Sequence, residues 1–144
     1  MDKFVIENII RRFDFTKDEI EDLKLYKGLT YVSYNTDKIT RRNVERMIEN
    51  ICNCILDIGK IILSQNNIQM PGSYRDVLHK LGEANIIDND LAGEMAEIIG
   101  LRNILSHQYL DIKWQYISNF IEANLEKVEL FLMQVEKIIS LEIQ

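Results

Sequence analysis

The sequence has few of the glycines and prolines that form turns in all-β proteins, and it has no long apolar run of the kind that spans a membrane. Its 144 residues hold one proline and six glycines, too few for a chain that turns roughly every 8–12 residues. No apolar run approaches the roughly 18 residues of a transmembrane helix. The N-terminal stretch carries acids and arginines within its apolar part, which is not typical of a signal peptide. We therefore expect a helical, cytoplasmic protein without a membrane segment.

Metal ligands and cofactor motifs are also scarce. The two cysteines, Cys52 and Cys54, point about 200° apart on a helix, which makes them poor disulfide partners. No second Cys/His pair exists, so we expect core or interface thiols and no metal site. His79 is interpreted as a helix-surface residue. The sequence has no phosphate-binding glycine loop, no dinucleotide-binding glycine motif and no H-E-x-x-H, and we expect no cofactor.

The balance of charge excludes a protein that coats nucleic acid. There are 17 Lys and Arg against 23 Asp and Glu, a formal net charge of −6. Residues 80–100 carry one base and five acids and should repel RNA. Arg41, Arg42 and Arg46 gather near Lys38, and we hypothesise that these arginines line an approach for RNA. The alternative is a solvated helix start.

Apolar residues recur in steps of three and four along most of the chain, which indicates amphipathic helices. We predict one kinked helix or two short ones over 3–30, with a capping-box pattern beginning at Thr16. A turn is expected within 31–40, and helices over 38–65, 74–84 (capped by Ser73), 89–106 and 112–141. The chain should form one domain, 1–144. This domain is an all-α, up-and-down helical bundle with three long helices and one or two short ones. The long apolar seams are either ordinary core or a face buried against a partner.

One segment concentrates polar chemistry at the end of an apolar helix: Arg102-Asn103-Ile104-Leu105-Ser106-His107-Gln108-Tyr109. On a continuous helix Arg102 and Tyr109 share a face, and Asn103 and His107 share a neighbouring one. Arginine offers a fork of donors for a phosphate, and histidine can transfer a proton near neutral pH. These residues suit metal-independent RNA cleavage, in which the 2′-hydroxyl attacks its own phosphate. The alternative is a helix C-cap, with Arg102 and His107 binding the last carbonyls.

This segment resembles the R-N-x-x-x-H-x-Y signature of HEPN-domain proteins, specifically HepT-type toxins. Further similarities follow in the order that the family shows: Val44-Glu45-Arg46, Cys54-x-x-Asp57-Ile58-Gly59, Pro71-x-Ser73-Tyr74, Leu81-Gly82 with Ile86-Ile87, and Asp111-Ile112. The resemblance covers most of residues 38–115. It implies a homodimer whose two motifs face a shared cleft. It also implies ribonuclease activity, with Arg102 and His107 as the catalytic pair supported by Asn103.

The resemblance further implies a toxin of a type VII-like toxin–antitoxin pair. An MntA-like nucleotidyltransferase antitoxin would inactivate the toxin by AMPylation of Tyr109. An attached phosphate and base would repel RNA and fill the cleft. Two alternatives remain. One is a non-catalytic subunit that binds nucleotide or substrate for a minimal nucleotidyltransferase, and the other is a structural protein with an inactive motif. His107 discriminates, because proton transfer requires it and binding does not.

Overall fold

The longest helix, α3 (Lys38–Gln65), runs the length of the bundle in this computed structural model, which describes residues 1–106 and 109–143. Asp37 begins it, because its carboxylate accepts hydrogen bonds from the amides of Ile39 and Thr40. These bonds hold the pKa of Asp37 below its usual range. The helix buries a stripe of residues from Val44 to Leu63. Its bounds confirm the predicted range of 38–65.

The N-terminal segment forms one helix, α1 (Lys3–Lys24), followed by the short helix α2 (Tyr31–Thr36). The capping box predicted at Thr16 is wrong. Thr16 is buried inside α1, and its hydroxyl donates to the carbonyl of Arg12 at 2.6 Å. The helix continues because Phe13 and Ile20 keep the apolar period on both sides of Thr16. Helix α2 occupies most of the region where we expected a turn.

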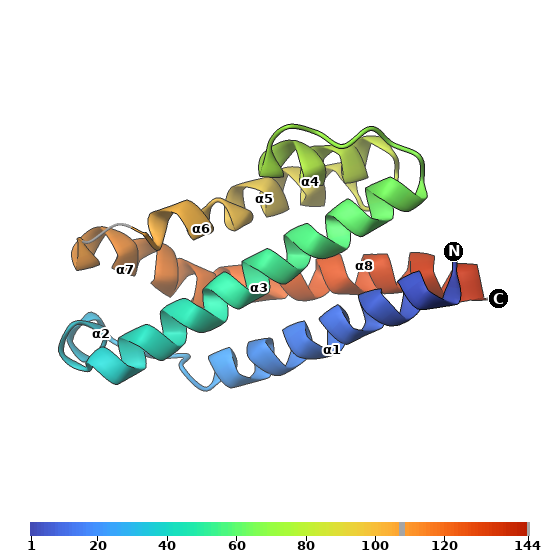
Figure 1. The fold of residues 1–144 in the computed structure, drawn as a ribbon. Coiled ribbons are helices and arrows are strands. Elements are labelled where there is room, and N and C mark those ends of the chain that lie inside the picture. The colour runs from blue at the N-terminus through green and yellow to red at the C-terminus, as the bar shows by residue number, and fades with distance from the viewer. Residues whose placement is uncertain (107–108, 144) are drawn as a thin grey trace.

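Two short helices, α4 (Tyr74–Glu83) and α5 (Asn89–Ile99), form an antiparallel pair above α3 (Figure 1). The Ser73 hydroxyl accepts from the Asp76 amide at 3.2 Å, which confirms the predicted cap. The pair approaches very closely at Gly82, where a Cβ atom would lie 2.7 Å from the Cβ of Ala92. A glycine is therefore required at this crossing for lack of space.

The C-terminal third contains two interruptions that the apolar period did not predict. The helix expected over 89–106 breaks at Gly100, and α6 (Leu101–Ile104) is a separate short piece. The helix expected over 112–141 is composed of α7 (Leu110–Asn119), the π-helical segment η1 (Phe120–Asn124) and α8 (Leu125–Ile143). A π turn holds more residues than an α turn. It therefore keeps the buried residues Ile117, Ile121 and Leu125, which follow one another in two steps of four, on the core side of the helix.

The helices enclose one apolar core and leave both termini at the same end of the bundle (Figure 1). Helices α2 and α7 lie at the opposite end. The described residues contain no strand, and the all-α prediction is confirmed. Within these residues, no helix is long and apolar enough to cross a membrane.

Candidate active site

The residues of the predicted motif lie where α6 ends and α7 begins. Arg102 and Asn103 are on α6, and Tyr109 directly precedes α7 with an extended backbone. The motif is divided between two helices, as the predicted break between 106 and 112 implies, so Arg102 and Tyr109 do not share the face that a continuous helix would give them. The chain leaves α6 after Ile104 and starts a new helix at Leu110. His107, the predicted proton-transfer residue, lies outside the described residues.

Arg102 is a motif residue whose positive charge has no acidic partner in the described part of the chain. Its side chain is half-buried and lies close enough to Cys52 of α3 to affect that thiol electrostatically. Burial raises the pKa of the Cys52 thiol to about 12, and the charge of Arg102 opposes this shift. Among the described residues, no carboxylate lies within ion-pair distance of Arg102. Its guanidinium is therefore available to a phosphate.

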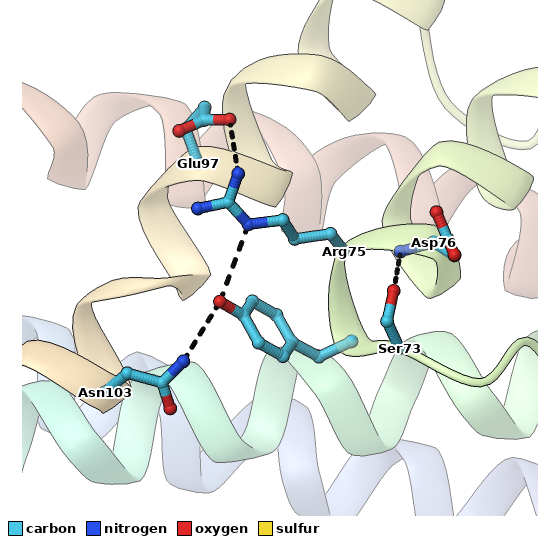
Figure 2. Close-up of polar contacts among 6 residues, drawn as sticks. Ser73, Arg75, Asp76, Glu97 and Asn103 are labelled. Carbon is cyan, nitrogen blue, oxygen red and sulfur yellow. Dashed lines mark hydrogen bonds and ion pairs between the residues drawn. The ribbon is translucent and has the colours of Figure 1, made fainter.

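Asn103 is exposed and is held by residues from two other helices (Figure 2). Its side-chain nitrogen donates to the Tyr74 hydroxyl at 3.1 Å. The same hydroxyl accepts from Nε of Arg75 at 3.5 Å, and Arg75 forms an ion pair with Glu97 of α5 at 3.0 Å. The sequence pattern pointed to Asn103 but gave no role to Tyr74, Arg75 or Glu97. The sequence signals for Tyr74 are its place after the capping Ser73 and the Pro71-x-Ser73-Tyr74 similarity to the family.

Tyr109 projects into solvent from a firmly anchored helix start. It is 71% exposed, and its carbonyl accepts from the Lys113 amide at 3.2 Å. The buried ammonium of Lys113 donates to Glu45 of α3 at 2.9 Å, and the Tyr34 hydroxyl donates to the same carboxylate at 3.0 Å. Burial and the Glu45 charge raise the pKa of Tyr34. The Trp114 ring packs on Tyr34 with centroids 5.2 Å apart. Helix α7 is thus fixed to α2 and α3 one turn beyond Tyr109.

The three arginines predicted to guide RNA differ in their contacts. Arg41 is half-buried and donates hydrogen bonds to the backbone carbonyls of Tyr34 and Asn35, so its side chain caps the C-terminal end of α2. Arg46 forms an ion pair with Glu49 at 3.2 Å. Arg42 is exposed and makes no ion pair within the described part of the chain. The RNA approach stays a prediction, and Arg42 is the arginine best placed to contribute to it.

The acidic stretch over residues 80–100 is largely paired. Glu83, Glu94 and Glu97 bind lysine or arginine side chains at about 3 Å, two of them from other helices. A pocket of about 510 Å³ lies beside this stretch and is lined by Leu101 and Ile104 of α6. These two residues and the Arg102–Asn103 pair point to opposite sides of α6. Neither Arg102 nor Asn103 lines the pocket, whereas Arg75 and Glu97, which are linked to Asn103 through Tyr74, do.

Both cysteines are free thiols, Cys52 buried and Cys54 half-buried. In the part of the chain that the structure describes, no group of three His, Cys, Asp or Glu side chains comes together as a metal site would require.

Comparison with known proteins decides the family. The family described as "Ribonuclease HepT-like" matches residues 16–135. The chain belongs to the ribonuclease HepT-like family. The resemblance seen in the motif is thereby confirmed over most of the chain.

Two characterised family members are similar in sequence. The "mRNA nuclease HepT" of Shewanella oneidensis is 28% identical over 85 residues, which cover 59% of this chain and 64% of that protein. The match thus spans slightly less than two thirds of that relative. The "tRNA nuclease HepT" of Aphanizomenon flos-aquae is 27% identical over 124 residues, which cover 85% of this chain and 84% of that protein.

Solved structures show the same fold. The tri-AMPylated Shewanella oneidensis HEPN toxin, in complex with an MNT antitoxin, superposes with a TM-score of 0.81 at 24% identity. The superposition covers 95% of this chain and 99% of that one. The cytosolic protein YutE of Bacillus subtilis, of unknown function, has a TM-score of 0.78 at 20% identity, with 94% and 91% covered. The fold of this HepT-like chain is therefore that of HEPN toxins.

Proposed function

We propose that this HepT-like protein is a metal-independent endoribonuclease toxin of a type VII-like toxin–antitoxin pair. The observation that carries the proposal is the guanidinium of Arg102, which makes no ion pair with a described residue, beside the exposed, hydrogen-bonded Asn103 at the family motif. Relatives named as mRNA and tRNA nucleases support an RNA substrate. His107 completes the catalytic set, with Arg102 as its partner and Asn103 in support.

The proposed reaction uses the nucleophile that RNA itself provides. His107 takes the proton from the ribose 2′-hydroxyl, whose oxygen forms a bond to the adjacent phosphorus. The bond from phosphorus to the 5′-oxygen breaks, and that oxygen takes a proton from solvent, while the protonated His107 returns its proton to solvent. The products are a 2′,3′-cyclic phosphate and a 5′-hydroxyl. Arg102 stabilises the negative charge that grows on the phosphoryl oxygens. No metal-activated water is needed, because the attacking oxygen belongs to the substrate.

The functional unit is proposed to be a homodimer with the two motifs at a shared cleft. Ile112 and Tyr116 are exposed and four residues apart, so they lie on one side of α7. Such an apolar strip next to the motif suits contact with a second copy. Each protomer would then place its Arg102 and His107 near those of its partner.

Tyr109 is proposed as the residue that an MntA-like nucleotidyltransferase antitoxin AMPylates. Its hydroxyl group is accessible to a second enzyme, because the side chain is 71% exposed. The tri-AMPylated state of the structurally similar toxin supports this regulation. An AMP group two residues from His107 adds a phosphate charge that repels RNA, and Arg102 can bind that phosphate instead.

RNA cleavage by the purified chain tests the catalytic proposal. Labelled tRNA and mRNA are incubated with wild type, His107→Ala and Arg102→Ala in the presence of EDTA. His79→Ala serves as the control, because His79 is exposed on α4. We expect cleavage by wild type and by the control, and a loss of roughly 100-fold or more for His107→Ala. Cleavage abolished by EDTA would refute metal independence. Tight nucleotide binding without cleavage would favour the non-catalytic subunit.

Intact mass spectrometry tests the regulatory proposal. The chain is co-expressed with the nucleotidyltransferase encoded next to it, as wild type, Tyr109→Phe and Tyr116→Phe. We expect wild type to gain the mass of one or more AMP units, and Tyr109→Phe to gain none. Tyr116→Phe should behave as wild type, because Tyr116 is an exposed tyrosine of α7 that lies outside the motif. Equal modification of Tyr109→Phe would exclude Tyr109 as the acceptor.

A further inference from the structure

Asn103 stands on a helix too short to orient an exposed side chain by itself. Helix α6 has four residues, and the amide group of Asn103 is at the surface. The backbone is held on the motif side, because the Ser106 hydroxyl donates to the Asn103 carbonyl at 2.7 Å. The side chain has one hydrogen-bond partner within the described residues, the hydroxyl of Tyr74. The orientation of this motif amide therefore depends on a residue from another helix.

Tyr74 is well suited to impose an orientation. It is the first residue of α4, directly after the Ser73 cap, and its half-buried ring packs against the core. Its hydroxyl accepts from Asn103 and lies 3.5 Å from Nε of Arg75. Arg75 is tied to α5 by its ion pair with Glu97. That pair is exposed at the surface and adds little to stability, so its effect is mainly geometric.

The arrangement lies beside Gly100, at the junction of α5 and α6. A Cβ atom at position 100 would lie 3.4 Å from Nη2 of Arg75 and 3.5 Å from the Tyr74 hydroxyl oxygen. The same atom would approach the Glu97 carbonyl to 3.1 Å. The hydroxyl and the guanidinium therefore lie directly beside the α5–α6 junction. The phenol oxygen itself accepts from Arg75 of α4 and from Asn103 of α6.

We propose that Tyr74 is a positioning residue that orients Asn103 for RNA cleavage, an inference that rests on the proposed function. Because the Asn103 nitrogen is committed to Tyr74, its carboxamide oxygen points away from the ring (Figure 2). That oxygen presents an acceptor to a substrate hydroxyl. Without the Tyr74 hydroxyl, the amide rotates freely and offers nitrogen and oxygen in turn. Arg75 and Glu97 act on Asn103 only through Tyr74.

A double-mutant cycle on RNA cleavage tests the proposal. Loss of one neutral hydrogen bond predicts that Tyr74→Phe lowers kcat about 3- to 10-fold, with KM unchanged. In an Asn103→Ala background the same change should have no further effect, because the group that Tyr74 orients is gone. Tyr26→Phe is the matched control, since Tyr26 is also half-buried against the core, and its hydroxyl bonds to no described residue. Effects of Tyr74→Phe and Asn103→Ala that multiply would overturn the proposal.

A second measurement does not depend on activity. In ¹⁵N–¹H correlation spectra of the full chain, the Asn103 side-chain amide signal is assigned by its loss in Asn103→Ala. We expect Tyr74→Phe to move this signal and Tyr26→Phe to leave it unchanged. An unmoved signal in Tyr74→Phe overturns the positioning role. If the signal moves in Tyr74→Phe but the wild-type chain cleaves no RNA, the contact between Tyr74 and Asn103 stands. The proposed function, and with it the catalytic role of that contact, is then overturned.

Discussion

The ion pair between Lys113 and Glu45 should stabilise this fold far more than the surface ion pairs do. The two side chains retain only 11% and 18% of their exposure, and their charged atoms are 2.9 Å apart. Replacement of Lys113 by Met keeps the aliphatic stem but leaves the Glu45 charge in a poorly hydrated site. Removal of one partner from a buried pair costs about 3–5 kcal/mol. The Tyr34 hydroxyl still bonds Glu45, so we expect Lys113→Met to lower the free energy of unfolding by about 2–3 kcal/mol.

Urea unfolding followed by circular dichroism measures this loss. The matched control is Lys127→Met, because Lys127 and Glu94 also pair at 2.9 Å but remain 43% and 44% exposed. The control should lose less than about 1 kcal/mol. Adding Glu45→Gln to Lys113→Met removes the unpaired charge and should recover part of the loss. Equal losses for Lys113→Met and Lys127→Met would refute the argument that burial sets the difference.

Three further predictions concern packing, titration and assembly. Gly82→Ala should lower the free energy of unfolding by about 1–3 kcal/mol, because the added Cβ would meet the Ala92 Cβ at 2.7 Å; an unchanged melting temperature in calorimetry would contradict this. Burial raises the pKa of the Cys52 thiol to about 12. The neutral Cys52 thiol therefore stabilises the fold fully below the thiol pKa of the unfolded chain, about 8.5. This contribution declines as pH rises toward the thiol pKa of the folded chain. The urea midpoint should fall above pH 9 more in wild type than in Cys52→Ala, and equal slopes would exclude this origin. Ile112→Glu should yield monomers in light scattering, whereas Leu141→Glu, at the far end of the bundle, should not.

The starts of α3 and α4, each capped by a polar side chain, were predicted well from the sequence. Asp37 and Ser73 each bond an amide of the first turn, and α3 and α4 begin directly after them, within a residue of the prediction. The break at Gly100 and the π segment after Asn119 were missed. Apolar residues keep helical spacing through both places, so periodicity alone cannot reveal them. Thr16 shows the converse error, a capping pattern inside a continuous helix.

The motif residues were predicted from their order in the chain, but their partners were not. Tyr74 lies 29 residues from Asn103, and Glu45 lies 68 residues from Lys113. These contacts form only when separate helices pack, so no local spacing encodes them. The sequence indicated which side chains are candidates for the chemistry. The fold shows which side chains contact them.

The neighbouring ends of the bundle have a practical consequence. The Met1 ammonium contacts the Glu142 carboxylate at 3.0 Å, and both ends lie far from α2 and α7 (Figure 1). A few added residues could join the ends, and new ones could be opened in the exposed loop around Met70, which connects α3 and α4. Circular permutants of this kind would keep every helix and reverse the order in which α1 and α8 are synthesised. They could also carry a fused reporter without covering the motif.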